Sequence, residues 1–180
     1  MVQVVERSSP MRDSGILSEA VIPAVPGEFY SYSSRFTKDQ PLYVFMKCKA
    51  NKARSLASAI ELESECNLVF RFGEYPRVCS IKTAHSSGLL GESTNNELFG
   101  ETWIAVTEIT TKNFYNLRSW KNVDALVKTC HVACSKREVS AELNQGVVIA
   151  FVTDIGKYGM FVVKELTSES IDIDAWHILL

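Results

Sequence analysis

The hydrophobic pattern is clearest in the last third of the chain, where residues 146–178 predict three consecutive antiparallel strands. The run 147–152 is continuously apolar and rich in β-branched residues, which is typical of a strand buried on both faces. A short loop with Asp and Gly leads to a second apolar strand, 158–165. After a polar turn, residues 171–178 begin with alternating apolar and acidic residues. This alternation predicts a strand with one solvent-exposed face. We therefore expect a three-stranded C-terminal meander, with 147–152 nearer the sheet centre and 171–178 nearer an edge.

Earlier in the chain, alternating or apolar runs predict further strands at residues 28–36, 42–49, 67–72, 77–83 and 101–110. Two other stretches have helical spacing. Residues 51–64 carry one apolar stripe, and residues 119–134 carry another that includes two cysteines. Asn51 and Ser119 are expected to cap these helices, and residues 84–96 and 135–145 are expected to be loops.

These elements predict an α+β fold. We expect a mainly antiparallel β-sheet, or a partly closed barrel, of about seven or eight strands with two amphipathic helices and the C-terminal meander. The alternative is an all-β sandwich in which residues 119–134 form a strand. A chain of 180 residues has the length of one domain, and residues 16–180 are expected to form it. Residues 1–15 are polar and predict a loose N-terminal arm.

The composition narrows the class of protein. With 46% hydrophobic and 22% charged residues, the chain has the make-up of a folded globular protein. Its net charge of −2 argues against binding nucleic acid or anionic membrane as a main activity. No apolar run approaches the roughly 20 residues that span a bilayer, and the N-terminus lacks the pattern of a signal peptide. An odd count of five cysteines and the absence of any glycosylation acceptor favour a reducing compartment, so we expect a cytoplasmic protein with free thiols.

The sequence contains no complete motif for binding a metal or a cofactor or for covalent catalysis. Cys130, His131 and Cys134 offer zinc-ligand atoms on one helix, but no second Cys/His pair completes a four-ligand site, so we expect no metal. Asp172 and Asp174 are interpreted as carboxylates that keep one face of an edge strand exposed to solvent and discourage pairing with another sheet edge. The sequence contains no Walker loop, dinucleotide fingerprint, H-E-x-x-H or G-x-S-x-G motif. We therefore expect no cofactor, and no sequence signature marks a cysteine nucleophile.

Two sets of residues remain as candidate binding sites. The first could line a ligand pocket and combines aromatic residues with a histidine: His85, Tyr30, Tyr32, Trp103 and Trp176. The second gathers positive charge: Lys47, Lys49, Lys52 and Arg54. Several glutamates lie close to the second set in the sequence and dilute its charge, so nucleic acid is not an expected partner.

The function predicted from the sequence is that of a non-catalytic binding or assembly protein. It would act through its sheet surface and N-terminal arm, on a protein partner or by self-association. The alternative is a small-molecule-binding protein, or a cofactor-independent enzyme, with an aromatic-lined cavity. Aromatic residues gathered with His85 around a closed cavity would favour the alternative, whereas aromatic residues spread over an open sheet face would favour the first function.

Overall fold

The structure is a computed structural model that describes residues 28–44, 53–55, 66–86, 100–154 and 156–179. In these residues, ten strands form two five-stranded antiparallel sheets, accompanied by a few short helices. The α+β class and the dominance of antiparallel sheet are confirmed. The two sheets are separate and do not close into a barrel.

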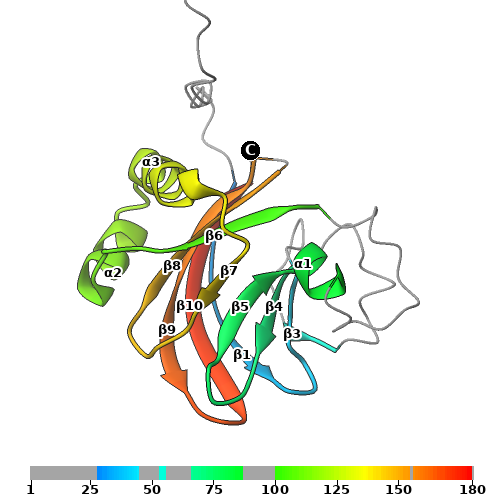
Figure 1. Cartoon of the computed structure of the whole chain (residues 1–180). Coiled ribbons are helices and arrows are strands. Elements are labelled where there is room, and N and C mark those ends of the chain that lie inside the picture. The colour runs from blue at the N-terminus through cyan, green and yellow to red at the C-terminus, as the bar shows by residue number, and fades with distance from the viewer. Residues whose placement is uncertain (1–27, 45–52, 56–65, 87–99, 155, 180) are drawn as a thin grey trace, which may run out of the picture.

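Sheet A has the strand order β1-β10-β9-β8-β6 (Figure 1). Its strands are β1 (Glu28–Thr37), β10 (Ser170–Leu179), β9 (Tyr158–Leu166), β8 (Val148–Thr153) and β6 (Thr102–Val106). The predicted meander is therefore confirmed as β8, β9 and β10. The predicted strand placement is wrong, because β1 pairs along the whole length of β10 and makes β9 the central strand.

Sheet B has the strand order β3-β2-β4-β5-β7. Its strands are β2 (Leu42–Val44), β3 (Ala53–Arg54), β4 (Cys66–Arg71), β5 (Arg77–Ser80) and β7 (Ser140–Glu142). The predicted strand 42–49 is described only as far as Val44, and the predicted strand 77–83 ends at Ser80. The short strand β7 falls in a stretch that was expected to be a loop.

The helix expected at residues 51–64 is wrong where the structure describes it. Ala53 lies opposite Tyr43 and packs against the core between the sheets, so residues 53–54 form a strand at the edge of sheet B. Cross-strand pairing and burial here override the local helical spacing. Residues 51–52 and 56–64 of that prediction lie outside the described residues.

The helices are α1 (Ile81–Ser86), α2 (Thr111–Ser119) and α3 (Val123–Ala133), with the 3-10 helix η3 (Cys134–Lys136) after α3. The helix expected at residues 119–134 is confirmed as α3, although its cap is Asn122, whose side chain accepts a hydrogen bond from the Ala125 amide at 3.0 Å. The all-β alternative is wrong for this segment. None of the helices in the described residues has the length and hydrophobicity needed to span a lipid bilayer.

The chain packs in three layers, with α2 and α3 on one face of sheet A and sheet B on the other (Figure 1). We call these the helix face and the sandwich face of sheet A. The strand β10 was expected to have a wet face, but Asp174, Trp176 and Ile178 on that side are buried on the helix face. Only Asp172, beyond the helices, stays partly exposed, where it pairs with Arg35.

Candidate functional site

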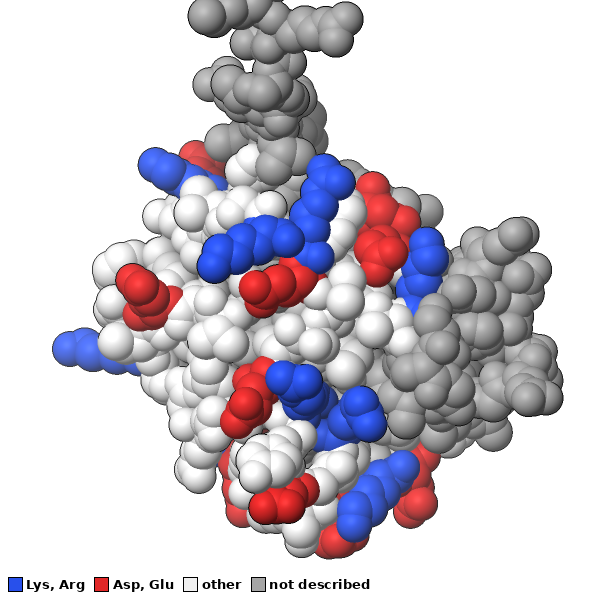
Figure 2. Space-filling model, viewed as in Figure 1, with Lys and Arg blue, Asp and Glu red and all other residues white. Residues whose placement is uncertain are grey.

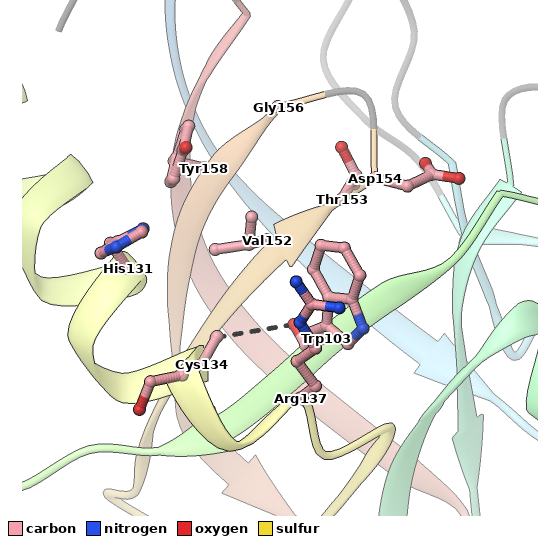
Figure 3. Close-up of a pocket in the computed structure, with 10 residues that line it drawn as sticks. Trp103, His131, Cys134, Arg137, Val152, Thr153, Asp154, Gly156 and Tyr158 are labelled. Carbon is pink, nitrogen blue, oxygen red and sulfur yellow. Dashed lines mark hydrogen bonds between the residues drawn. The ribbon is translucent and has the colours of Figure 1, made fainter. Parts of the chain in front are cut away.

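A pocket of about 210 Å³ lies where the end of α3 meets the ends of β6, β8 and β9 (Figure 3). We call it the Trp103 pocket. It is lined by Trp103, His131, Cys134, Ser135, Arg137, Val152, Thr153, Asp154, Gly156 and Tyr158. Val152 forms the floor, with His131 and Tyr158 on one side and Trp103 and Arg137 on the other (Figure 3). The pocket therefore combines an apolar floor with a polar rim.

The positive charge of the rim is placed by the chain reversal after η3. Arg137 has a left-handed backbone with φ of 55°, and its amide donates a hydrogen bond to the Cys134 carbonyl at 2.9 Å. Its guanidinium group lies 5.1 Å from the centroid of the Trp103 ring, within the range of a cation–π contact. The turn thus holds an exposed cation beside the apolar floor.

The opposite end of the rim is formed by the β8–β9 turn. Gly156 takes a φ of +78°, which glycine adopts without strain, and its amide donates to the Thr153 carbonyl at 3.0 Å. Asp154 accepts a hydrogen bond from the Glu101 amide at 3.0 Å, which ties its carboxylate to the start of β6. This carboxylate therefore already has a partner within the chain.

The Cys134 thiol in the pocket and the buried Cys130 thiol behind it both have raised pKa values. Burial raises the pKa of Cys134 to about 12, and its Sγ lies 3.6 Å from the Trp103 carbonyl oxygen. Burial, followed by the neighbouring Cys134, raises the pKa of Cys130 well above its ordinary value, and this thiol bonds to the Gly159 carbonyl at 3.2 Å. Because the thiolate is the nucleophilic form, neither group is prepared for covalent chemistry.

The remaining polar groups of the lining include the Tyr158 hydroxyl. Burial, followed by the neighbouring Cys130, raises the pKa of Tyr158, so its hydroxyl stays protonated at neutral pH. Within the described residues, no group of three or more His, Cys, Asp or Glu side chains is arranged to hold a metal ion. The arrangement offers hydrogen-bond donors and a cation around an apolar floor.

A second polar cluster surrounds the buried Asp174 beside α2. Asp174 of β10 accepts hydrogen bonds from Ser33 and, at 2.7 Å, from the Tyr115 hydroxyl, and it lies 3.5 Å from the Lys164 ammonium and 3.8 Å from the Arg118 guanidinium. Burial opposes its ionisation, but the hydrogen bonds from Ser33 and Tyr115 and the two cations more than offset this, so the pKa of Asp174 lies below its ordinary value. This cluster fastens α2 to sheet A.

A larger and more open groove of about 580 Å³ lies on the other side of α3. Its wall includes Val106 of the edge strand β6 and Val132 of α3, which are 54% and 64% exposed. Because the groove is open, a small molecule in it would keep much of its surface in water.

The ligand-binding set expected from the sequence is not brought together. Trp103 lines the pocket, but Trp176 is fully buried on the helix face, where its ring centroid is 5.4 Å from that of Phe29. Tyr30 and Tyr32 lie on the sandwich side of β1, each with its ring against His177, at centroid distances of 5.2 and 5.8 Å.

His85 belongs to α1, beside sheet B, and its side chain lies outside the described residues. The aromatic residues of the set therefore fill the layers of the fold and do not line one cavity.

The expected basic set is largely outside the described residues, which include only Arg54, in β3, and not its side chain. Lys47, Lys49 and Lys52 are not described. On the described part of the face in Figure 2, Lys and Arg are interspersed with Asp and Glu, without a broad patch of one sign.

Sequence reasoning singled out Trp103 and considered His131 and Cys134, but it missed Arg137 and Asp154 as pocket residues. Both residues lie in turns, and the residues that each turn meets are decided by the register of the sheet. The sequence indicated them only by their position next to the ends of strands or helices, where binding residues concentrate.

No protein-family model matches the sequence, and no curated protein matches it. The crystal structure of a DUF4466 family protein from Parabacteroides merdae ATCC 43184 is similar to this chain, with a TM-score of 0.60 and 10% sequence identity. The match covers 85% of this chain and 54% of that one, so this chain spans about half the length of that protein. At this identity the similarity shows a shared fold and carries no information on activity.

Proposed function

We propose that the protein is a non-catalytic binding protein and that the Trp103 pocket receives an apolar side chain from a polypeptide segment. The size of the pocket is the main support. At about 30 Å³ for each water, 210 Å³ holds about seven waters, which is the scale of one large side chain. Small-molecule sites are commonly about 300–1,000 Å³.

The chemistry of the lining supports binding over catalysis. The Cys134 thiol has a pKa of about 12, and the Asp154 carboxylate accepts a backbone hydrogen bond. Val152 offers an apolar contact, while Arg137 and Tyr158 offer donors for backbone carbonyls or a carboxylate. An apolar anchor in a pocket with a polar rim is the usual arrangement of a protein-binding hot spot.

The alternative functions have less support. A cofactor-independent enzyme would need a general base or nucleophile with a pKa suited to its task, whereas the pKa values of the Cys134 thiol and the Tyr158 phenol in this pocket are shifted towards the protonated forms. We also propose that the protein acts in a reducing compartment such as the cytoplasm, which is consistent with the free thiols of Cys79, Cys130 and Cys134.

The test uses amino-acid amides as probes. N-acetyl-leucinamide and N-acetyl-phenylalaninamide are titrated into the full-length protein while the indole N–H resonance of Trp103 is followed by NMR. We expect saturable shifts with both probes and none with N-acetyl-glycinamide, which has no side chain to insert. The variant Ser135→Phe should fill the pocket from its rim and abolish the shifts.

The matched control is Ser168→Phe, at an exposed position in the β9–β10 turn, which should bind like the wild type. Equal shifts with the glycine probe, or unchanged binding in Ser135→Phe, would contradict the proposal.

A further inference from the structure

The register of sheet A places the start of β1 near the Trp103 pocket. Glu28 lies opposite Leu179, and the adjacent Ile178 lies opposite Tyr158, which lines the pocket. Two strand spacings of about 4.8 Å therefore separate the start of β1 from the strand that carries Tyr158. The chain that precedes Glu28 enters the fold at the end of the sheet where the pocket opens.

The sequence immediately before β1 has the chemistry to fill such a pocket. Residues 16–26 (ILSEAVIPAVP) lie outside the described residues and contain five large aliphatic side chains: Ile16, Leu17, Val21, Ile22 and Val25. Pro23 and Pro26 disfavour a helix and a central strand. At 3.3–3.6 Å for each residue, an extended segment of this length reaches about 36–40 Å, enough to cross all five strands of sheet A.

One charge of the segment has an opposite charge at the pocket. Glu19 is the only charged residue of the segment. The pocket lining holds the exposed Arg137, whose guanidinium group lies over the Trp103 ring, and one carboxylate, Asp154, which accepts a hydrogen bond from the Glu101 amide. A carboxylate arriving with an apolar side chain would meet a cation at the rim.

We propose that the occupant of the Trp103 pocket is residues 16–26 of the same chain, with one aliphatic side chain on Val152 and Glu19 beside Arg137. The inference rests on the proposed function and names its ligand. A segment joined to β1 through Gly27 is presented to the pocket at a millimolar effective concentration, far above that of a second copy in dilute solution. An outside partner would then bind by displacing it.

The test is competition in the full-length protein. The affinity of N-acetyl-leucinamide is measured from the Trp103 indole resonance in the wild type and in the double variant Leu17→Asp/Ile22→Asp. We expect at least tenfold tighter probe binding in the double variant, because its segment no longer competes. The control Val2→Asp/Val5→Asp places the same charges in the N-terminal arm and should match the wild type.

The outcomes separate this inference from the function on which it rests. Equal probe affinity in all three proteins would overturn the segment as occupant and leave the pocket as a binding site. Absence of probe binding in all three would overturn the proposed function itself. The wild type could also bind the probe more tightly after hundredfold dilution and show a dimer mass in light scattering. This result would overturn the same-chain assignment, since a second copy would then supply the segment.

A charge reversal tests the pairing of Glu19 with Arg137. Glu19→Lys should tighten probe binding in the wild-type background, because like charges weaken the docked segment. In the Arg137→Glu background, where the probe itself has lost a donor, Glu19→Lys should instead weaken probe binding relative to Arg137→Glu alone, because opposite charges again hold the segment. Additive effects in the combined variant would show that the two residues do not meet.

Discussion

The two faces of sheet A are covered by different elements and differ in the polar groups beside their apolar clusters. On the sandwich face, rings from both sheets contact one another, including Phe161 with Phe70 at a centroid distance of 5.7 Å and Phe151 with Tyr43 at 6.1 Å. On the helix face, aliphatic residues pack with Phe114, Trp176 and the two cysteines at and after the end of α3, and the charged cluster of Asp174 lies beside them. The sandwich face is mainly a core of stacked and tilted rings with the buried His177 at its edge, whereas the helix face combines packing with a cluster of charged groups.

The difference follows from the shapes of the covering layers. A second sheet presents a broad surface that excludes water along the strands. Helices as short as α2 and α3 leave their ends and the sheet ends uncovered, and these places hold the Trp103 pocket and the open groove. We therefore expect changes on the sandwich face to act mainly on stability and changes at the helix ends to act mainly on binding.

The largest effect is expected for Phe151→Ala. Its ring is fully buried between the sheets, so the loss in free energy of unfolding should be about 3–5 kcal/mol. The neighbouring residue Val152 points to the helix face, and Val152→Ala should cost only about 1–2 kcal/mol, since it removes two methyl groups. Urea unfolding of both variants measures the contrast. A loss below about 1 kcal/mol for Phe151→Ala would show that its ring is not part of the core between the sheets.

The second prediction concerns acid and the sandwich face. His177 is fully buried beside Tyr30 and Tyr32, and burial, followed by the charge of Lys157, lowers its pKa to about 3. The unfolded chain binds a proton below about pH 6.5. Stability should therefore fall with decreasing pH between about 6.5 and 3, by about 1.4 kcal/mol for each pH unit.

The measurement is urea unfolding from pH 7 to pH 4 for the wild type and for His177→Gln, which cannot titrate. The difference in free energy between the two should change only below about pH 6.5. An NMR titration that shows the His177 ring gaining a proton near pH 6 in the folded protein would contradict the prediction.

Gly159→Ala is the third prediction. A Cβ atom at this position would lie 2.2 Å from Cζ of Phe151 and 2.7 Å from Cβ of His177, on the sandwich face. Both neighbours are buried and cannot move freely, so we expect a loss of about 1–3 kcal/mol from overpacking. Gly159→Ala should cost less stability when it is made in the Phe151→Leu background than in the wild type, because the shorter leucine leaves room for the new Cβ atom. An equal cost in both backgrounds would show that the strain does not come from Phe151.

The sequence predicts the meander well because its strands contact one another in sequence order and carry long apolar runs. The helix α2 was missed because its sequence, TKNFYNLRS, has only Phe114 buried and shows almost no apolar period. The strand β3 was missed because its two residues, paired with Leu42 and Tyr43, leave too short a pattern to outweigh the helical spacing around them. In both cases the deciding contacts are distant in the sequence.

The candidate site was predictable only in part. Trp103 was expected to bind a ligand and lines the pocket, but Tyr32 and Trp176 belong to opposite faces of sheet A. An aromatic residue in a strand has the same sequence signature whether it packs in a core or lines a pocket. The role of Arg137 depends on a left-handed turn after η3, which no pattern of apolar residues could have indicated.

The smallest effect is expected on the helix face, at Asp174. Asp174→Asn keeps the shape of the side chain but removes the negative charge that faces Arg118 and Lys164 and weakens the hydrogen bond from Tyr115. Since these partners keep some access to water, we expect a loss of about 1–2 kcal/mol at neutral pH. The pKa of Asp174 is lowered in the folded protein, so this contribution is present above the ordinary pKa of 3.8 and is lost as the pH falls through the folded value.

The wild type and Asp174→Asn should therefore differ in stability at pH 7 and converge as the pH falls below 3.8 and through the lowered pKa of Asp174. Urea unfolding of the two proteins at pH 7, 5, 4 and 2.5 measures this convergence, and Asp172→Asn, on the same strand but beyond the helices, serves as control. If the difference vanished already near pH 6, the acid sensitivity of the helix face would have to come from another group. If the difference did not shrink at all between pH 4 and pH 2.5, the lost contribution would be one of packing and not of charge.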